Sequence, residues 1–300
     1  MDGLLNLLKP PGMTSHDCVE ELRRLVGMRR IGHTGTLDPG AAGVLVCCIG
    51  RTTRLSEFLM EQDKAYRVEL VLGVSTTTGD ALGEVLMRRG VSVRGEDLER
   101  VLRRFLGTIQ QVPPMVSAVH HEGRRLYELA RRGIEVERAP RTVTVHEIRL
   151  LRFDPPRALL DITCSKGTYV RQLAHDIGEA LGCGAHAGFM IRTRVGPHRL
   201  EESYTFEEVE EAVRNGEFRR LLIPPAQALP DLPEVEVEGR MRAAVLHGQP
   251  LPLWKVAPHL TLPQGTLVKV LDVEGNLLAI GRAVGGQLRP YKVLLVASGR

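Results

Sequence analysis

Hydrophobic residues recur at two spacings along the chain, and each spacing predicts a different kind of element. The run GLLNLLK (3–9) is stopped by two prolines, which predicts a short strand. A capping-box pattern in TSHD (14–17) precedes apolar positions three and four residues apart and a final Gly27, which predicts a helix. A second helical stripe runs over 98–106 and is closed by Gly107.

Strand patterns are as frequent as helical ones. They cover 66–75, 141–153 and 157–165, and the last of these alternates apolar and polar residues, as a strand with one buried face does. Because long strands are mixed irregularly with helices, the chain is predicted to be an α+β protein around a mixed, largely antiparallel sheet.

The composition of the chain changes near its C-terminal end. Prolines are frequent over 224–233, which is typical of a linker, and short strand patterns follow in GTLVKVLD, LLAIGRAV and YKVLLVA. We therefore expect two domains, a large one over 1–230 and a small β domain over 231–300.

Length and composition exclude several classes of protein. With 300 residues, 43% of them hydrophobic, the chain can bury a substantial core. The longest apolar run, AAGVLVCCI (41–49), is far shorter than the roughly 20 residues that cross a bilayer. The N-terminal MDGLLNLLKPPG lacks the basic start and the cleavage site of a signal peptide, so we expect a cytoplasmic protein.

The five cysteines are scattered and include no CxxC pair. This argues against a disulfide framework and against a structural zinc site. Cys183 and His186 have the spacing of half a metal site, but no second half follows, so no metal is expected.

The net charge of +4 does not by itself identify a nucleic-acid partner. Of the 40 basic residues, 34 are arginine, the side chain best suited to bidentate contact with phosphate. A GC-rich genome would produce the same bias, and both explanations stay open.

Two charged residues stand in unusual contexts. Asp38 lies in a glycine-rich turn, GHTGTLDPG, where an aspartate can simply close the turn. Arg171 lies in the first turn of a helix predicted after Thr168, a candidate cap, and a cation there opposes the helix dipole. A bound anion would remove this conflict, and so would a side chain that extends into solvent, which this segment alone favours. The glycine-rich segment matches neither GxGxxG nor a GK[ST] phosphate loop.

Several segments, taken in order, carry a family resemblance that covers nearly the whole chain. They are NLLKPPGMTSHD, RRIGHTGTLDPGAAGVLVCCIGRTTRL, DKAYRVELVLG, VPPMVSAVHHEGRRLYELARRGIEV and CSKGTYVRQLAHDIGEALGCGAH. These segments resemble the TruB family of bacterial tRNA pseudouridine synthases, and the C-terminal β segment resembles a PUA RNA-binding domain, a small barrel. GHTGTLDP followed far downstream by CSKGTYVR is the most specific part of the match.

The resemblance implies an isomerase that converts the T-loop uridine at tRNA position 55 to pseudouridine by base flipping. In that family Asp38 matches the catalytic aspartate, Tyr66 the aromatic residue that stacks on uracil, and Arg171 the partner of the aspartate. The substrate-binding positions it implies are His33, which fills the gap left by the flipped nucleotide, Asp80, Met190, Lys9 and Lys64.

The resemblance also implies which partners the chain needs. The isomerisation is redox-neutral, so neither a cofactor nor a metal is expected. The partner is tRNA, held by its T-arm and acceptor stem, with no obligatory protein partner and no membrane, and the chain is expected to be a monomer.

Some positions depart from the family pattern, and other functions stay open. The family more often has Lys at His120, Tyr at Val116, Arg at Ile191 and TDTxD in place of TTTGD. One alternative is a guide-dependent pseudouridine synthase, and another is an RNA-binding module in which Asp38 only closes a turn. A third is a hydrolase that uses Asp38 and Asp80 to release uracil.

Overall fold

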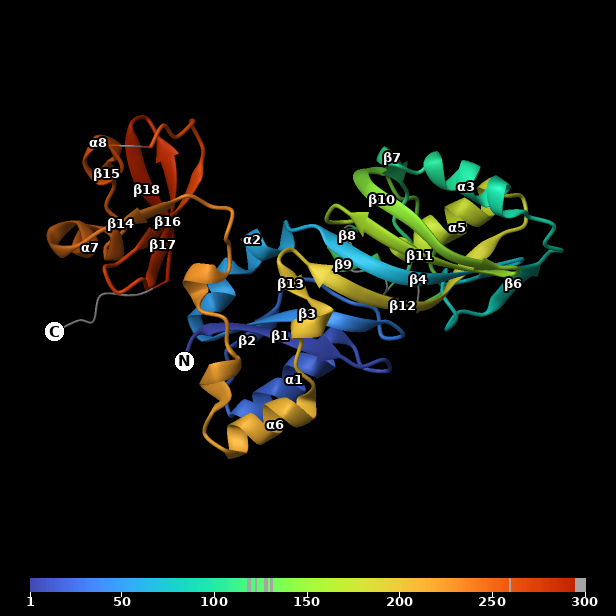
Figure 1. Cartoon of the computed structure of the whole chain (residues 1–300), viewed down its shortest axis with the longest axis horizontal. Helices are drawn as coiled ribbons and strands as arrows, with labels where there is room; N and C mark the ends of the chain where they lie inside the picture. The colour runs from blue at the N-terminus through green and yellow to red at the C-terminus, as the bar shows by residue number, and fades with distance from the viewer. Residues whose placement is uncertain (118–119, 122, 127–128, 130–131, 259, 295–300) are drawn as a thin grey trace.

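A large sheet forms the body of the computed structural model, and a smaller sheet lies at its C-terminal end (Figure 1). The structure describes residues 1–117, 120, 121, 123–126, 129, 132–258 and 260–294. The strands are β1 (Gly3–Lys9), β2 (Ile31–His33), β3 (Ala42–Ile49), β4 (Lys64–Leu72), β5 (Val74–Thr76), β6 (Val85–Arg88), β7 (Gly107–Gln111), β8 (His120–His121), β9 (Arg124–Arg125), β10 (Arg141–Asp154), β11 (Arg157–Cys164), β12 (Ala185–Val195), β13 (His198–Arg199), β14 (Glu234–Glu236), β15 (Leu251–Pro252), β16 (Leu267–Leu271), β17 (Leu277–Val284) and β18 (Gln287–Val293). The helices are α1 (Ser15–Val26), α2 (Ser56–Met60), α3 (Gly95–Arg103), α5 (Val170–Ala180), α6 (Phe206–Arg214), α7 (Gly239–Leu246) and α8 (Leu253–Val256), with 3₁₀ turns at Gly50–Leu55, Leu200–Glu202, Phe218–Leu221 and Pro225–Gln227.

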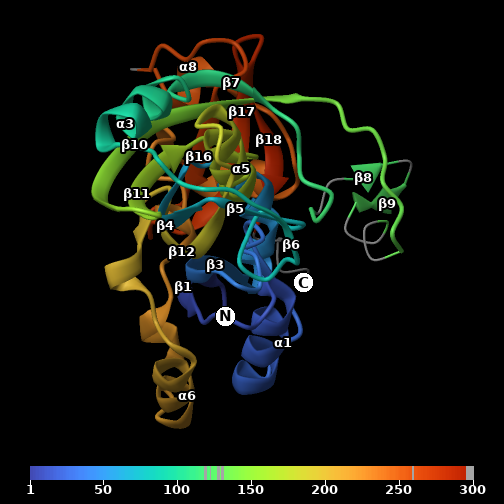
Figure 2. The same cartoon turned by 90° about the vertical axis from the view of Figure 1, so that its right-hand side faces the viewer.

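The large sheet has the strand order β1-β3-β12-β4-β11-β10-β7, with β2 paired to β3 and β13 to β12. Its strands pair antiparallel except for β3 and β12, which run parallel and meet at Ala42–Ile191 and Gly43–Arg192. The expected α+β class and the mixed, largely antiparallel sheet are therefore confirmed. Figure 2 shows that the short pair β8–β9 stands away from this sheet.

Two helical layers cover the large sheet. α1 and α6 lie side by side and pack on β1 and β3 (Figures 1 and 2), with Leu22 and Val209 fully buried. α3 and α5 pack against β10 and β12, where Leu173 and Ile177 join the other main core. No helix in the described part of the chain has the length and apolar character needed to span a membrane.

Local signals at both ends of α1 predicted this helix correctly. The Thr14 hydroxyl accepts the Asp17 N–H at 3.0 Å, and the Asp17 carboxylate accepts the Thr14 N–H at 2.8 Å, which is the predicted capping box. Gly27 ends the helix in the left-handed region, with φ +68°.

Two element boundaries predicted from the sequence are wrong. The helix over the apolar stripe 98–106 ends at Arg103, and Leu106 is exposed, because the Arg104 N–H turns to the Val101 carbonyl and β7 begins at Gly107. The strand predicted over 66–75 is two strands, since β4 ends at Leu72 and the chain turns at Gly73, whose φ is +84°.

The C-terminal segment forms one five-stranded sheet in the order β14-β16-β17-β18-β15. Two of its three predicted strands, β16 and β17, are confirmed, while β18 begins earlier than expected and residues 295–297 lie outside the described part. The finer assignments, a closed PUA-like barrel and a domain boundary at 230/231, stay predictions.

The proline-rich stretch over 224–233 is packed, not free. Ala228 is fully buried and Leu229 is 8% exposed, and both join a cluster that includes Leu4 of β1 and Ile280 of β17. The composition is typical of a linker, and burial of these apolar side chains fixes the stretch between the two sheets.

A second contact ties the C-terminal sheet to α2, which lies between the two sheets in Figure 1. The Lys292 ammonium lies 2.7 Å from the Glu57 carboxylate, and the Arg54 guanidinium donates to the Val293 carbonyl. The rings of Phe58 and Tyr291 meet edge to face with centroids 6.0 Å apart. α2 is thus held from the C-terminal side by β18.

The parallel pairing of β3 and β12 depends on Gly43. Its φ is +111°, and a Cβ built there would lie 2.2 Å from the Arg192 carbonyl oxygen. We predict that Gly43→Ala lowers the free energy of unfolding by at least ~2 kcal/mol, through backbone strain and weakened strand pairing. Gly90→Ala, at a site with nothing within 4 Å, should change it by less than ~0.5 kcal/mol. Urea unfolding of both variants measures the difference, and equal stabilities would contradict the role of Gly43.

Candidate active site

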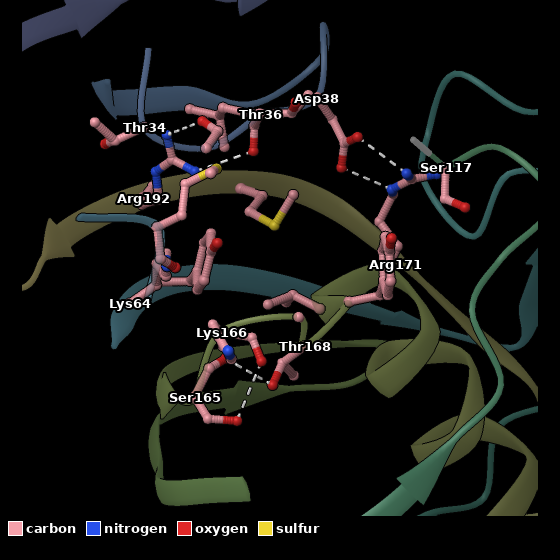
Figure 3. A pocket seen from close by; sticks show the side chains of 18 of the residues that line it. Thr34, Thr36, Asp38, Lys64, Ser117, Ser165, Lys166, Thr168, Arg171 and Arg192 are labelled. Carbon is pink, nitrogen blue, oxygen red and sulfur yellow. Dashed lines mark hydrogen bonds and ion pairs between the residues drawn. The ribbon is translucent and has the colours of Figure 1, made fainter. Parts of the chain in front are cut away.

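A cavity of about 440 Å³ opens where the loop after β2, the start of α5 and the strands β4 and β12 converge. Asp38, Lys64, Tyr66, Arg171 and Met190 all line it, so five of the eight predicted site residues meet in one place. Figure 3 shows Asp38 and Arg171 on one side of the cavity and Lys64 and Arg192 on the other.

Asp38 and Arg171 form a bidentate ion pair. Arg171 Nε donates to Asp38 Oδ2 at 2.8 Å, and Nη2 donates to Oδ1 at 2.9 Å (Figure 3). The Arg171 side chain is 3% exposed, whereas that of Asp38 is 33% exposed and faces the cavity. The anion predicted to accompany Arg171 in the first turn of α5 is therefore the carboxylate of Asp38.

Arg171 also holds two other segments of the chain. Its Nη1 donates to the Thr78 carbonyl at 2.8 Å, and its Nη2 donates to the Val116 carbonyl at 2.9 Å. Asp80 lies 3.6 Å from Arg171 Nε and receives the Thr78 hydroxyl at 2.6 Å, so it supports the guanidinium from the side and does not line the cavity. One buried guanidinium thus ties four parts of the chain together.

The floor of the cavity comes from neighbouring strands. Lys64 and Tyr66 lie two residues apart on β4 and so share one face. Tyr66 pairs in register with Arg192 of β12, and Met190 lies on the same side of β12. The Tyr66 ring and the Met190 side chain give the floor an apolar surface, and Lys64 and Arg192 give it positive charge.

Burial changes the acidity of three groups around the cavity. It lowers the pKa of Lys64 to about 8, and the nearby Arg192 charge adds to this effect. It raises the pKa of Tyr66 to about 12, so the phenol keeps its proton at neutral pH. Burial, together with the Arg192 charge, also lowers the pKa of His33 below its usual 6.5, which leaves the ring neutral at pH 7.

Arg192 is a site residue that sequence reasoning missed. It is 2% exposed, and its guanidinium donates to the carbonyls of Val44 at 2.7 Å, Thr36 at 3.1 Å and Gly35 at 3.2 Å. It therefore fixes the loop that carries Asp38 from below. The MIRTR segment contains no local signal that separates this arginine from its neighbours, because its role depends on the pairing of β12 with β3.

The start of α5 is held differently from the prediction. The Thr168 hydroxyl donates to the Ser165 carbonyl and does not cap the helix, whose N-cap is Tyr169. The buried amide of Gln111 holds the backbone of this N-cap residue, since its oxygen accepts the Tyr169 N–H at 2.8 Å and its nitrogen donates to the Tyr169 carbonyl at 3.1 Å. Gln111, which sequence reasoning also missed, holds Tyr169 in place at the wall of the cavity.

Lys9 and His33 lie beside the cavity and do not line it. The Lys9 ammonium is fully buried and donates to the carbonyls of Pro10, Pro39 and Ala41 at 2.8, 3.3 and 2.8 Å. It braces the turn after Asp38 from within. His33 is half-buried at the end of β2, and its Nδ1 accepts the Gly35 N–H at 3.3 Å.

The departures from the family pattern leave the ion pair intact. Val116 contacts Arg171 through its carbonyl, so the identity of its side chain does not enter that bond. In TTTGD the Thr76 and Thr78 hydroxyls hold Asp80. The side chain of His120 lies outside the described residues.

The described residues contain no group of three or more His, Cys, Asp or Glu side chains that could hold a metal ion. Cys183 is buried, and His186 Nδ1 contacts the Val74 carbonyl at 2.9 Å.

Comparisons with known proteins agree on one family. Residues 23–170 match the N-terminal domain of TruB family pseudouridylate synthases, and residues 171–229 match the C-terminal domain of tRNA pseudouridylate synthase B. A tRNA pseudouridine synthase B from Moorella thermoacetica is 50% identical over 97% of this chain and 99% of its own length. One from Symbiobacterium thermophilum is 55% identical over 83% and 82%.

Among solved structures, a Cbf5-Nop10-Gar1 complex contains a chain that superposes with a TM-score of 0.78 at 29% identity, covering 98% of this chain and 85% of that one. An H/ACA RNP bound to a substrate RNA containing 2′-deoxyuridine gives 0.76 at 28% identity, with the same coverage.

The burial of the Asp38–Arg171 pair leads us to expect a large effect of Arg171 on the free energy of unfolding. Arg171→Lys keeps a charge but loses the planar fork that serves Asp38, Thr78 and Val116 at once, so it should lower the free energy of unfolding by about 2 kcal/mol or more. Arg67 makes the same bidentate pair with Asp161 but is 46% exposed, so Arg67→Lys should cost less than ~1 kcal/mol. Chemical unfolding of both variants tests this, and equal losses would show that burial does not strengthen the Arg171 pair.

Proposed function

Because the chain belongs to the TruB family of pseudouridylate synthases and acts as a pseudouridine synthase on tRNA, we propose that it isomerises the T-loop uridine at position 55 with Asp38 as the catalytic carboxylate. The observation that carries this proposal is the bidentate pair of Asp38 with the buried Arg171, at the wall of a cavity whose floor is Tyr66.

The pair fixes the orientation of Asp38. Both carboxylate oxygens accept hydrogen bonds from Arg171, so the carboxylate is held in one plane at the wall of the cavity. The remaining lone pairs of Asp38 face the cavity, where the ribose and the base of a uridine would lie. An ionised carboxylate at this place is what a rearrangement at C1′ requires.

The floor of the cavity suits a uracil that must turn without leaving. The Tyr66 ring offers a flat face, and Met190 offers an adaptable apolar surface, 7% exposed. The face of the Tyr66 ring and the apolar part of Met190 make no directional contacts, so a base that lies on this floor can rotate after its bond to C1′ breaks.

Access to C1′ requires that the uridine leave its stack in the RNA. Flipping costs a few kcal/mol, and a flat side chain that fills the gap offsets part of this cost. His33 stands at the rim beside the Asp38 loop, and its lowered pKa leaves it neutral, which suits stacking between bases. Asp80 would orient Arg171 from behind, and Lys9 would hold the Asp38 turn.

The C-terminal sheet would hold the tRNA outside the T-loop, at the acceptor stem. Of its basic residues, Lys269 contacts Glu234, Lys292 contacts Glu57 and Arg242 lies 3.7 Å from Asp272, so these charges serve the fold. Within the described residues, no ion pair within 4 Å involves Arg240, Lys255 or Arg289, and Lys255 lies beside the exposed ring of Trp254. These three cations would meet phosphates.

The activity of the purified chain on tRNA tests the function. We expect nuclease digestion and mass spectrometry to find one uridine per tRNA converted to an isomer of equal mass, with no guide RNA and no protein partner added. Asp38→Asn should abolish conversion and leave tRNA binding nearly unchanged, since the amide keeps the turn but loses the charge.

Other products would point to other functions. Free uracil would indicate a hydrolase, and bound but unchanged tRNA would indicate a binding module or an enzyme that depends on a guide. Asp38→Asn turnover within about tenfold of the wild type would refute the role of Asp38.

The role of the C-terminal sheet has its own test. Replacing Arg240, Lys255 and Arg289 together by alanine should weaken tRNA binding and lower the slope of log Kd against log salt by about one for each phosphate that is no longer neutralised. The rate at saturating tRNA and the turnover of an isolated T-arm hairpin should stay unchanged, because groups remote from the uridine bind ground and transition states equally. A loss of hairpin turnover would place these residues in the chemistry instead.

A further inference from the structure

The cavity floor carries two positive charges that form no ion pair with any carboxylate of the described residues. Lys64 is 8% exposed and Arg192 is 2% exposed. In the part of the chain that the structure describes, the polar partners of both groups are backbone carbonyls, and no ion pair within 4 Å involves either. Burying two cations that have no ion-pair partner in the described part of the chain costs free energy, because both lose their hydration. Their position across the cavity from Asp38 indicates that they have a function there.

Lys64 and Arg192 differ in whether they have an N–H group left to donate to a ligand in the cavity. Arg192 uses its guanidinium to hold Gly35, Thr36 and Val44, which is a structural task. The Lys64 ammonium donates to the Met60 carbonyl at 2.8 Å and to the Gln62 carbonyl at 2.5 Å, at the end of α2. An ammonium has three N–H bonds, so one has no partner among the described residues, and Lys64 lines the cavity.

The reaction creates a negative charge that such a cation can meet. When the C1′–N1 bond breaks heterolytically, its electron pair stays with the departing uracil, which is an anion until its C5 bonds to C1′. The proton then leaves C5 and N1 gains one, so atoms and electrons balance and no redox partner is needed. A preorganised charge at the place where an anion develops stabilises the transition state more than the ground state.

We infer that Lys64 stabilises the detached uracil anion, and that it forms, opposite the Asp38–Arg171 pair, the electrostatic half of the active site. This role rests on the proposed function, because it assumes that a uracil is released within the cavity. Figure 3 shows Lys64 and Asp38 on opposite sides of the cavity. Tyr66 lines the same cavity two residues from Lys64 on β4, so a base stacked on its ring would lie between the ammonium and the carboxylate. Arg192 adds to the positive potential and keeps the loop in place.

The groups around Lys64 set the pH range over which it carries its charge. Arg192 and burial favour the neutral amine, while Asp63 and Glu61, on the segment before β4, favour the ammonium. The Cys164 thiol pairs with Lys64 in register and has a pKa raised to about 11 by burial, and Tyr66 keeps its proton. Lys64 therefore loses its charge near pH 8, below the pKa of these neighbours, and the rate should fall as pH rises through this value.

The pH dependence of turnover by three full-length proteins tests this role. For the wild type, kcat/KM on tRNA reports the free enzyme and should fall about tenfold per pH unit above about pH 8. Lys64→Arg keeps its charge, so this alkaline decline should move beyond about pH 10. Lys64→Met should lower the single-turnover rate at saturating tRNA about 100-fold at pH 7 and show no decline near pH 8.

Other outcomes would overturn the role of Lys64. If Lys64→Met reached the wild-type rate at saturation but bound tRNA more weakly with a smaller salt slope, Lys64 would contact a phosphate. If Lys64→Arg kept the wild-type alkaline decline, a group other than Lys64 would be titrating. The pH profile of Lys64→Arg therefore tests the role of Lys64 even if Lys64→Met fails to fold. A wild type that makes no pseudouridine at any pH would instead refute the proposed function itself.

Discussion

The ion pair between Asp38 and Arg171 is the contact on which the arrangement of the site depends. A guanidinium that is 3% exposed needs partners for its N–H groups, since an unpaired buried charge costs several kcal/mol. Its partners are Asp38, Thr78 and Val116, which are 133, 93 and 55 residues away along the chain. Because these three partners must reach the Arg171 guanidinium, three separate segments meet at the start of α5. The Asp38 carboxylate is thereby placed at the cavity.

Features that depend on neighbouring residues could be predicted from the sequence. The capping box of Thr14 and Asp17 and the end at Gly27 defined α1, because a helix end is satisfied by groups within one turn. The place of Arg171 in the first turn of a helix raised two alternatives, a bound anion or a solvated side chain, and the structure shows the first. The family resemblance then pointed to Asp38, Tyr66, Lys64 and Met190, which the structure brings to one cavity.

Features that depend on strand pairing and packing could not be predicted in this way. Arg192 acts on the Asp38 loop because β12 runs parallel to β3, and Gln111 reaches Tyr169 across the sheet edge. Thr168 had a good local pattern for a cap, but its hydroxyl bonds the Ser165 carbonyl, and the N-cap is Tyr169, whose backbone is held by the distant Gln111 amide. The prolines over 224–233 are typical of a linker, but no local pattern indicated that Ala228 is buried in a cluster shared by both sheets.

α2 connects the site to the C-terminal sheet. On one side, the carbonyls of Met60 and Gln62 at its C-terminal end, where the helix dipole is negative, receive the Lys64 ammonium. On the other side, Glu57 and Phe58 contact Lys292 and Tyr291 of β18. The position of the Lys64 charge is therefore set by a five-residue helix whose outer face is fixed by the C-terminal sheet. The packing of α2 against β18 therefore supports the wall of the cavity where Lys64 lies, and the C-terminal sheet contributes to the geometry of the site.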